Sequence, residues 1–301
     1  MKTYYKKGTI STSMQFLHWL PKSLHRHKCI EFLCNVGLQD KITEIKFNNR
    51  SRTIIDLSDP EPRNVFIKRE FEPHFFDIAK ALMPQNGMFF DLGANVGFCS
   101  FGLVSSRPEA CFHLFEASPL MINLLSLSIG LHQDHSFWLT QSCLSDREGE
   151  TRFHLTAEQS GQSHVAISGE EGIKVPNLLL DKYCQNHEIE RVDFAKIDLE
   201  GHELPALKGW TEFLSQHNAK AIYIEIIPEN QDRYGHETNA PLFFLESLGY
   251  SLFLCKPDDF GAFGDKVENR TFPEGMLSIC GFKAQDYPHC FATDVLALAK
   301  Q

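Results

Sequence analysis

The sequence predicts an α/β fold in which a mostly parallel sheet is covered by helices on both faces. From about Gly87 onward, short continuous apolar segments alternate with longer segments of helical periodicity. Strands buried on both faces are continuously apolar, and their alternation with helices is typical of parallel sheets. The composition is that of a globular protein, since 43% of the 301 residues are apolar and 23% are charged. A chain of this length can bury a large core.

Residues 1–64 are predicted to form an extension in front of the main domain, which is predicted to span 65–301. Residues 13–38 have helical character that is interrupted at Pro21. Segments 41–47 and 53–57 are β-strand-like, and the Asn- and Ser-containing turn between them indicates a β-hairpin.

In the main domain, helical and extended segments alternate. The expected strands cover 88–90, 111–115, 137–141, 193–197, 221–227, 250–255 and 276–282, with a further strand end near residue 174. The expected helices cover 71–83, 98–106, 119–131, the segment before Asn186, 204–216 and 240–248. The polar, Gly-containing stretch 257–273 is interpreted as a loop.

The charge balance limits the classes of partner. Twenty-nine basic and 39 acidic residues give a net charge of −10, which argues against nucleic acid, because phosphate binding needs a broad basic surface. Residues 1–50 carry nine basic and three acidic side chains, or +6, which leaves −16 for the remainder. This basic segment could contact an anionic partner or a membrane surface, although a solvated leader is the simpler interpretation.

The nine cysteines indicate a reducing compartment. Their number is odd and no C-x-x-C pair occurs, which argues against a disulfide framework or a zinc site. Neither a secretory signal nor a transmembrane segment is expected from the apolar pattern. A cytoplasmic location is therefore expected, and the sequence gives no indication of the oligomeric state.

The first chemical motif is Asp91-Leu-Gly-Ala-Asn-Val-Gly97, which follows a strand and opens a helix. Its glycines allow a tight turn and a close approach to a ligand. Ala94 stands where a dinucleotide fingerprint has its second glycine, and Asp91 would repel a pyrophosphate but attract an α-amino group. The motif therefore suits an amino-acid-bearing nucleotide such as S-adenosylmethionine. The alternative is a tight strand-to-helix turn without a ligand.

The second motif is Phe115-Glu-Ala-Ser-Pro119, in which Glu116 ends a strand 19 residues after Gly97. A carboxylate at this place in an open α/β sheet can accept hydrogen bonds from both hydroxyls of a ribose. Glu116 could alternatively cap the helix that starts at Pro119.

The third motif, Val192 to Glu203, has a strand ending at Asp198 and then Glu200, His202 and Glu203. Ligands bind at the carboxyl ends of parallel strands, and so many carboxylates repel one another unless a base role or a cation uses them. An acid-rich helix N-terminus is the alternative. A divalent metal such as Mg²⁺ is possible, but the sequence does not show which oxygens converge, so no metal ligand is assigned.

Together these motifs resemble the FkbM family of S-adenosylmethionine-dependent methyltransferases. The resemblance rests on Phe90 to Gly97, Phe115 to Pro119 and Lys196-Ile-Asp-Leu-Glu-Gly-His-Glu-Leu204, with support from Leu207-Lys-Gly209, Ile222-Tyr-Ile-Glu225 and Leu248-Gly-Tyr250. It implies the class I, Rossmann-like three-layer sandwich with a mostly parallel seven-stranded sheet. It also implies O-methylation of a hydroxyl on a sugar, glycolipid or secondary metabolite, so the expected partner is a small-molecule or glycan acceptor.

The resemblance also assigns roles to individual residues. The residues implied to contact the cofactor are Asp91, Gly93, Asn95 and Gly97 from the first motif, Glu116 at the ribose, and Ser142, Cys143 and Asp146 beside the adenine. Asp198 would stand where the donor and acceptor pockets meet.

A hydroxyl acceptor has a high pKa, so a base must take its proton at or before methyl transfer. The candidate bases are Asp198, Glu200, His202 and Glu225, of which Asp198 and His202 are favoured. Two other functions remain open. A nicotinamide-dependent oxidoreductase would share the strand-turn-helix and Glu116, and a non-catalytic module could bind S-adenosylmethionine without reacting.

Overall fold

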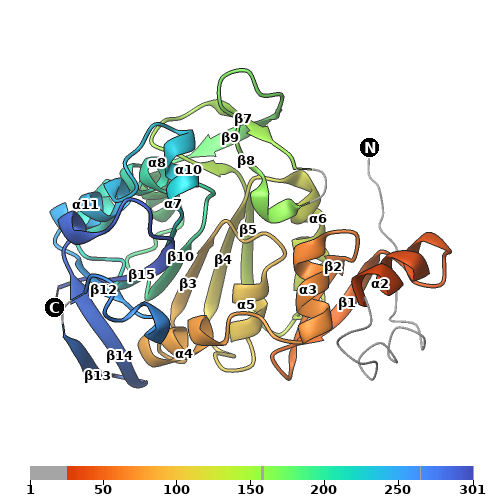
Figure 1. The fold of residues 1–301 in the computed structure, drawn as a ribbon, viewed down its shortest axis with the longest axis horizontal. Helices are drawn as coiled ribbons and strands as arrows, with labels where there is room; N and C mark the ends of the chain where they lie inside the picture. Colours follow the sequence, from red (N-terminus) through yellow and green to blue (C-terminus); the bar gives the residue numbers. More distant parts are fainter. Residues whose placement is uncertain (1–25, 157–158, 265, 301) are drawn as a thin grey trace.

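The computed structural model describes residues 26–156, 159–264 and 266–300, and its centre is a large mixed sheet (Figure 1). In sheet order, its nine strands are β13 (Val267–Phe272), β14 (Gly275–Phe282), β12 (Ser251–Leu254), β15 (Thr293–Leu298), β11 (Ala221–Ile226), β10 (Phe194–Ile197), β3 (Met88–Leu92), β4 (Cys111–Glu116) and β5 (Ser136–Gln141). The five strands from β11 to β5 are parallel, whereas β15 is antiparallel to both of its neighbours. The predicted α/β class is confirmed.

The chain winds outward twice from the middle of this sheet. It runs from β3 through β4 to β5, and then returns to the other side of β3 for β10 and β11. Ligands of open α/β sheets bind outside the carboxyl ends of the strands at the point where the strand order reverses, which here lies between β3 and β10.

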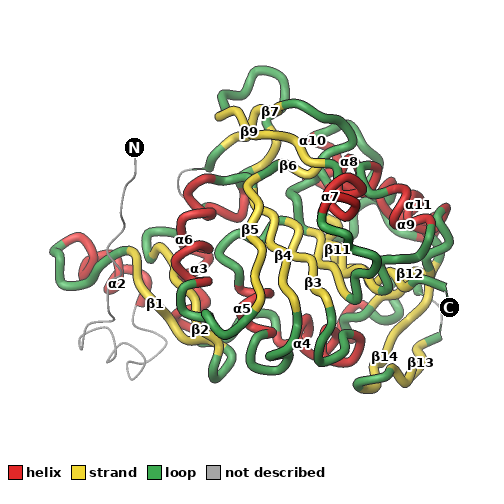
Figure 2. The backbone as a smooth tube through the Cα atoms, turned by 180° about the vertical axis from the view of Figure 1, so that it is seen from behind, coloured by secondary structure: helices red, strands yellow, loops and turns green. Residues whose placement is uncertain are grey.

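Helices cover both faces, as the views from front and back show (Figures 1 and 2). One face packs against α4 (Pro73–Leu82), α5 (Phe98–Leu103) and α6 (Pro119–Ile129); the other packs against α7 (Leu180–Asn186), α8 (Glu203–Lys208), α9 (Thr211–Ser215) and α11 (Ala240–Ser247). Neighbouring residues of β3 point to opposite faces of the sheet. Phe89 packs with the first set of helices, whereas Phe90 stacks on Trp210 on the other face, with 5.7 Å between the ring centroids. This alternation explains why the strands are apolar on both faces.

The N-terminal extension contains α2 (Arg26–Asn35), the hairpin β1 (Ile42–Phe47) and β2 (Ser51–Asp56), and α3 (Pro60–Lys68). The β-hairpin is confirmed as an antiparallel pair. It docks beside α5 and α6, where Thr53 Oγ1 donates to the Val96 carbonyl at 2.9 Å and the Ile54 N–H donates to Ser128 Oγ at 2.8 Å. The first part of the helical stretch expected over 13–38 lies outside the described residues. The domain boundary at residue 65 stays a prediction.

Ser128→Ala is expected to lower the free energy of unfolding by about 1–3 kcal/mol, because it leaves the buried Ile54 N–H without its acceptor. Urea unfolding measures the change, with Ser247→Ala as the control, since Ser247 is an exposed serine on α11. Equal stability of the two variants would contradict this account of how the hairpin docks.

Four predictions about the later elements are wrong. The helix expected over 204–216 is two helices, α8 and α9, which are separated at Gly209, where an added Cβ would lie 2.0 Å from the Ser145 carbonyl. The stretch 257–273 is not only a loop, because it contains β13, an edge strand whose exposed side chains give no apolar pattern. The last strand is β15, not the segment 276–282, and the sheet therefore has nine strands where seven are predicted.

A second, smaller sheet contains β6 (Cys143–Leu144), β9 (Ile173–Leu178), β7 (Glu150–His154) and β8 (His164–Val165). Of these four strands, the sequence predicts only β9, as the strand end near residue 174. Helices α3 and α10 (Pro228–Arg233) are also additional. Within the described ranges, no helix combines the length and apolar character that crossing a bilayer requires.

Candidate active site

A cavity of about 240 Å³ lies at the carboxyl ends of the parallel strands, at the switch point between β3 and β10. Ten of the twelve predicted site residues line it: Asp91, Gly93, Asn95, Glu116, Ser142, Cys143, Asp198, Glu200, His202 and Glu225. The other two are Gly97, which packs below the turn, and Asp146, which is an exposed residue beyond β6. Side chains that are distant in the sequence are therefore brought together in one space.

The turn after β3 requires its glycines. Gly93 has a φ of +89°, and a Cβ there would lie 1.9 Å from the carbonyl oxygen of Asp198. Its backbone therefore contacts the end of β10 directly, which joins the first and third motifs. Gly97 also has a positive φ, of +78°, and a Cβ there would lie 2.3 Å from the ring of Phe101, so this glycine serves packing at the start of α5.

Asp91 lies at the bottom of the cavity and is 1% exposed. Ser100 of α5 donates to its Oδ2 from the hydroxyl at 2.5 Å and from the backbone N–H at 3.3 Å. Burial raises the pKa of this carboxyl, and the nearby Lys196 opposes the rise. Asp91 therefore fixes the strand-to-helix turn and also faces the cavity, and its contact with a ligand stays a prediction.

Glu116 ends β4 with its carboxyl oriented by backbone groups. The Asn95 N–H donates to Oε2 at 2.8 Å and the Ser118 N–H donates to Oε1 at 2.8 Å. The helix-capping alternative is wrong, because the N-cap of α6 is Ser118, whose hydroxyl accepts from the Met121 N–H. Burial raises the pKa of Glu116, although the backbone hydrogen bonds act in the opposite direction. The carboxyl is thus held in place while it faces the cavity.

Ser142 follows β5 and lines the same end of the cavity as Glu116, whose carbonyl accepts from the Ser142 N–H at 3.0 Å. The Ser142 hydroxyl is buried and has no hydrogen-bond partner among the residues that the structure describes. Buried hydroxyls are normally satisfied, so this one indicates a place for a ligand atom. Cys143 lies beside it, and burial raises the pKa of its thiol to about 12, which makes it an unreactive apolar contact.

The ends of β10 and β11 place two carboxyls and one ammonium on one face of the sheet. Lys196 Nζ donates to Asp198 Oδ2 at 2.7 Å, and the Lys196 side chain is only 9% exposed. Glu225 of β11 lines the cavity next to Asp198. Nearby carboxyls, chiefly that of Asp198, raise the pKa of Lys196 against the effect of burial.

The acidic residues after β10 have different surroundings. Glu200 accepts from Asn230 Nδ2 at 2.7 Å, and burial followed by repulsion from Asp198 raises its pKa to about 8. His202 has its pKa lowered to about 4 by burial. Glu203 is structural, because its Oε1 accepts from the Leu199 and Gly201 N–H groups at 2.9 and 3.1 Å.

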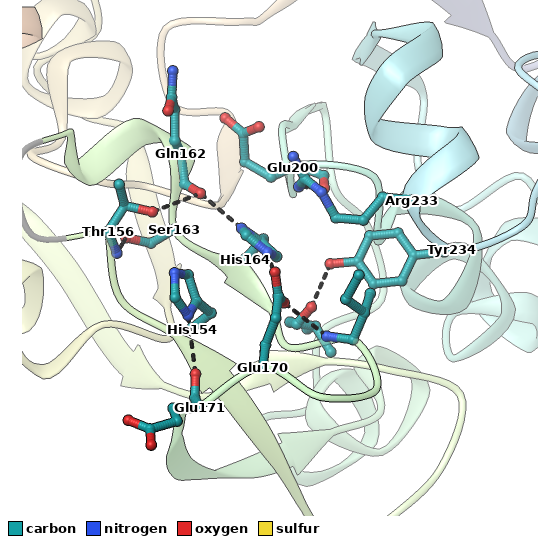
Figure 3. Close-up of polar contacts among 12 residues, drawn as sticks. His154, Thr156, Gln162, Ser163, His164, Glu170, Glu171, Glu200, Arg233 and Tyr234 are labelled. Carbon is teal, nitrogen blue, oxygen red and sulfur yellow. Dashed lines mark hydrogen bonds and ion pairs between the residues drawn. The ribbon is translucent and has the colours of Figure 1, made fainter.

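The small sheet forms one wall of the cavity and is tied to α10 (Figure 3). The Tyr234 hydroxyl, just after α10, donates to the Val165 carbonyl of β8 at 2.7 Å, and His164 contacts Glu170 at 3.1 Å. The 3₁₀ turn Ser160–Gln162 is bound on the other side, where Ser160 Oγ donates to Asn95 Oδ1 at 2.9 Å. The wall is therefore attached both to α10 and to the first motif.

Sequence reasoning missed the cavity residues contributed by α3, by the segment just before α4, and by β7, β8 and the connection between these two strands. These are Glu61, Phe71, Glu72, Phe153, Ser160, Gly161, Ser163 and Val165. Ser160 reaches the extension through its N–H, which donates to Asp59 Oδ2 at 2.9 Å. No local motif marks these residues, because they meet only through contacts between segments far apart in the chain. The one available signal is Asp59-Pro60-Glu61, an N-cap with proline in the first turn.

A metal centre is not apparent in the described part of the chain: no group of three or more His, Cys, Asp or Glu side chains there is arranged to hold a metal ion. Likewise, all nine cysteines are described and all are free thiols.

Comparison with known proteins finds one curated relative and several solved structures with a low sequence identity. The chain is 27% identical over 180 residues to Methyltransferase sdnD of Sordaria araneosa. The alignment covers 49% of this chain and 69% of that protein. Among solved structures, TYW2 of M. jannaschii in complex with AdoMet is 10% identical with a TM-score of 0.39, covering 87% of this chain and 88% of that one. A precorrin-6y C5,15-methyltransferase from Geobacter metallireducens GS-15 is 11% identical with a TM-score of 0.37, covering 76% and 89%.

A family model extends over the motifs themselves. The model of the methyltransferase FkbM domain matches residues 91–252, which is more than half of the chain. The match begins at the Asp91 turn and ends in β12, so it contains Glu116, Ser142, Asp198 and Glu225. The chain therefore belongs to the FkbM methyltransferase family.

Proposed function

We propose that this protein transfers a methyl group from S-adenosylmethionine to a hydroxyl of a small-molecule or glycan acceptor, such as a sugar, a glycolipid or a secondary metabolite. The observation that carries the proposal is that Glu116, Ser142 and Asp198 line one cavity in a chain of the FkbM methyltransferase family. Glu116 and Ser142 define the end of the cavity that suits the nucleoside, called the nucleoside end. Asp198 defines the end that suits the reaction.

The residues at the nucleoside end fit the adenosine part of S-adenosylmethionine. Glu116 presents an oriented carboxyl that can accept from two ribose hydroxyls. The Ser142 hydroxyl, for which the described residues offer no partner, can donate to a ring nitrogen. Gly93 and Asn95 also line the cavity, and Cys143 gives an apolar contact. We assign Gly97 to the support of the turn after β3. Asp146 is not among the residues that line the cavity, and its contact with the adenine stays a prediction.

The chemistry at the other end follows from the protein groups. S-adenosylmethionine supplies a methyl group on a sulfonium that is already activated for displacement. The protein must align an acceptor oxygen and remove its proton. Asp198 suits the base role, because Lys196 bonds to one of its oxygens and leaves the other lone pairs for the acceptor hydroxyl. His202 has too low a pKa, about 4, to hold a proton well at neutral pH. Glu200, with a pKa of about 8, is largely protonated there.

The charge of the cavity favours neutral or cationic acceptors. Asp198, Glu61 and Glu72 line it, and Lys196 is the cation among the lining residues. Burial, with repulsion from Asp198, raises the pKa of Glu61 to about 7. An acceptor with a phosphate or carboxylate would add to this repulsion, whereas a sugar hydroxyl would not. We also propose a cytoplasmic location, which the free cysteines support.

Glu116→Ala is expected to weaken S-adenosylhomocysteine binding by about 10- to 150-fold, the equivalent of the 1.5–3 kcal/mol typical of hydrogen bonds to a charged group. Titration calorimetry measures the affinity, with Glu109→Ala as the control, because Glu109 is an exposed glutamate just before β4. Equal affinity in the two variants would contradict the nucleoside assignment. If S-adenosylhomocysteine binds but no labelled methyl reaches a broad panel of hydroxyl compounds, the protein is a binding module instead.

A further inference from the structure

The sheet register places the carboxyls of Asp198 and Glu225 side by side. In the parallel pair of β10 and β11, Ile197 is opposite Ile224, so the next positions bring Asp198 opposite Glu225. Residues opposite one another in a sheet point to the same face, and both side chains line the cavity. Two carboxyls placed in this way can form a hydrogen bond with each other only if one of them carries a proton.

The groups around this pair are mainly negative. From β15, Asp294 is directly opposite Glu225, and Glu72 faces the same cluster from the start of α4. The cation that faces Asp198 is Lys196, bonded to it at 2.7 Å and nearly buried. Asp294 already pairs with Lys256 of the neighbouring loop and accepts from the Tyr223 hydroxyl at 2.8 Å. Lys196 therefore stabilises negative charge on Asp198 in preference to Glu225.

We propose that Asp198 and Glu225 form a dyad that shares one proton, with Glu225 as the protonated member and as a positioning residue for Asp198. Its part in catalysis rests on the proposed methyl transfer. The Glu225 carboxyl donates to Asp198 and, together with Lys196, fixes the direction of its free lone pairs. In the reaction, the acceptor O–H bond breaks, its proton passes to Asp198, and the oxygen forms the new bond to the methyl carbon. The electrons of the carbon–sulfur bond stay on sulfur.

The electrostatics agree with this geometry. Repulsion from Asp198 is the largest cause that raises the pKa of Glu225, burial is the second, and the result is about 10. Lys196 opposes the rise, and Asp294 adds to it. Glu225 therefore keeps its proton through neutral pH and loses it only in alkaline solution.

The experiment is a titration of the whole protein with ¹³C-labelled glutamate carboxyls, followed by NMR. Glu225→Gln identifies the Glu225 signal by its absence. In the unchanged protein this signal is expected to titrate near pH 10. Asp198→Asn is expected to lower its midpoint by about one unit or more, because the main repulsive charge is removed. Asp232→Asn, at an exposed position on α10, is the control and is expected to leave the midpoint unchanged.

Two results would overturn the dyad. One is a Glu225 midpoint in the ordinary range of glutamate, and the other is equal midpoints in the Asp198→Asn and Asp232→Asn proteins. Circular dichroism of each variant separates these results from unfolding. Glu225→Gln is expected to keep the affinity for S-adenosylhomocysteine. Once labelled methyl transfer is detected, Glu225→Gln, whose amide can still donate to Asp198, is expected to keep the turnover within about threefold of the unchanged protein. Glu225→Ala, which has no such donor, is expected to lose more of the turnover. If the unchanged protein fails to bind S-adenosylhomocysteine, the proposed function fails, but the NMR outcome still decides the dyad.

Discussion

Asp198→Asn is expected to lower the rate of methyl transfer by about 10²- to 10⁴-fold, the usual contribution of a positioned base. The amide keeps the size of the side chain but cannot take a proton, so S-adenosylhomocysteine affinity is expected to stay within about threefold of the unchanged protein. Asp198 reaches this place because it directly follows β10, with its N–H donating to the Leu92 carbonyl of β3 at 3.0 Å.

Transfer of a labelled methyl group from S-adenosylmethionine to a panel of hydroxyl compounds measures the rate. Asp258→Asn is the matched control, because Asp258 is an exposed aspartate after β12 that does not line the cavity. Normal turnover in the Asp198→Asn protein would remove Asp198 from the base role. Glu200 or His202 would then have to be tested in its place.

Gly93→Ala is expected to abolish S-adenosylhomocysteine binding and to destabilise the fold. The methyl group would lie 1.9 Å from the Asp198 carbonyl oxygen, so the turn after β3 and the end of β10 must separate. The left-handed φ of +89° adds a strain of about 1–3 kcal/mol for a residue other than glycine. Calorimetry and urea unfolding measure the two effects.

Gly149→Ala measures the backbone strain of a positive φ without a steric clash of the added methyl group. Gly149 also has a positive φ, of +105°, but an added Cβ there would meet no described atom within 4 Å. We expect Gly149→Ala to cost only the backbone strain and to keep ligand binding. If the two variants are equally stable and bind equally well, the contact between the first and third motifs does not hold the site together.

Much of the fold and the site could be predicted because the necessary signals are local. The strand β3 and the turn at Gly93 are marked by an apolar run and by glycines. The carboxyl ends of parallel strands meet at one edge of a sheet, so the strand-end positions of Glu116 and Asp198 suffice to place them near each other. Interactions within one strand or one turn are encoded in a few consecutive residues, which is why these assignments agree with the structure.

The remaining features depend on contacts between distant segments. The edge strand β13 has exposed side chains and therefore no apolar period. Ser160 enters the site only because it bonds to Asn95 and Asp59, which lie far away in the chain. Glu203 is a carboxylate like its neighbours in the motif, but its bonds to backbone N–H groups give it a structural role. Its sequence position alone does not distinguish it from Glu200.

A crystal structure of the protein with S-adenosylhomocysteine tests the central claim most directly. We predict that the ribose hydroxyls contact the Glu116 carboxyl, that the Ser142 hydroxyl bonds to the adenine, and that the sulfur lies on the side of the cavity formed by Asp198 and Glu225. A nucleoside bound elsewhere, or a Ser142 hydroxyl that stays without a ligand contact while Glu116 faces solvent, would contradict the account.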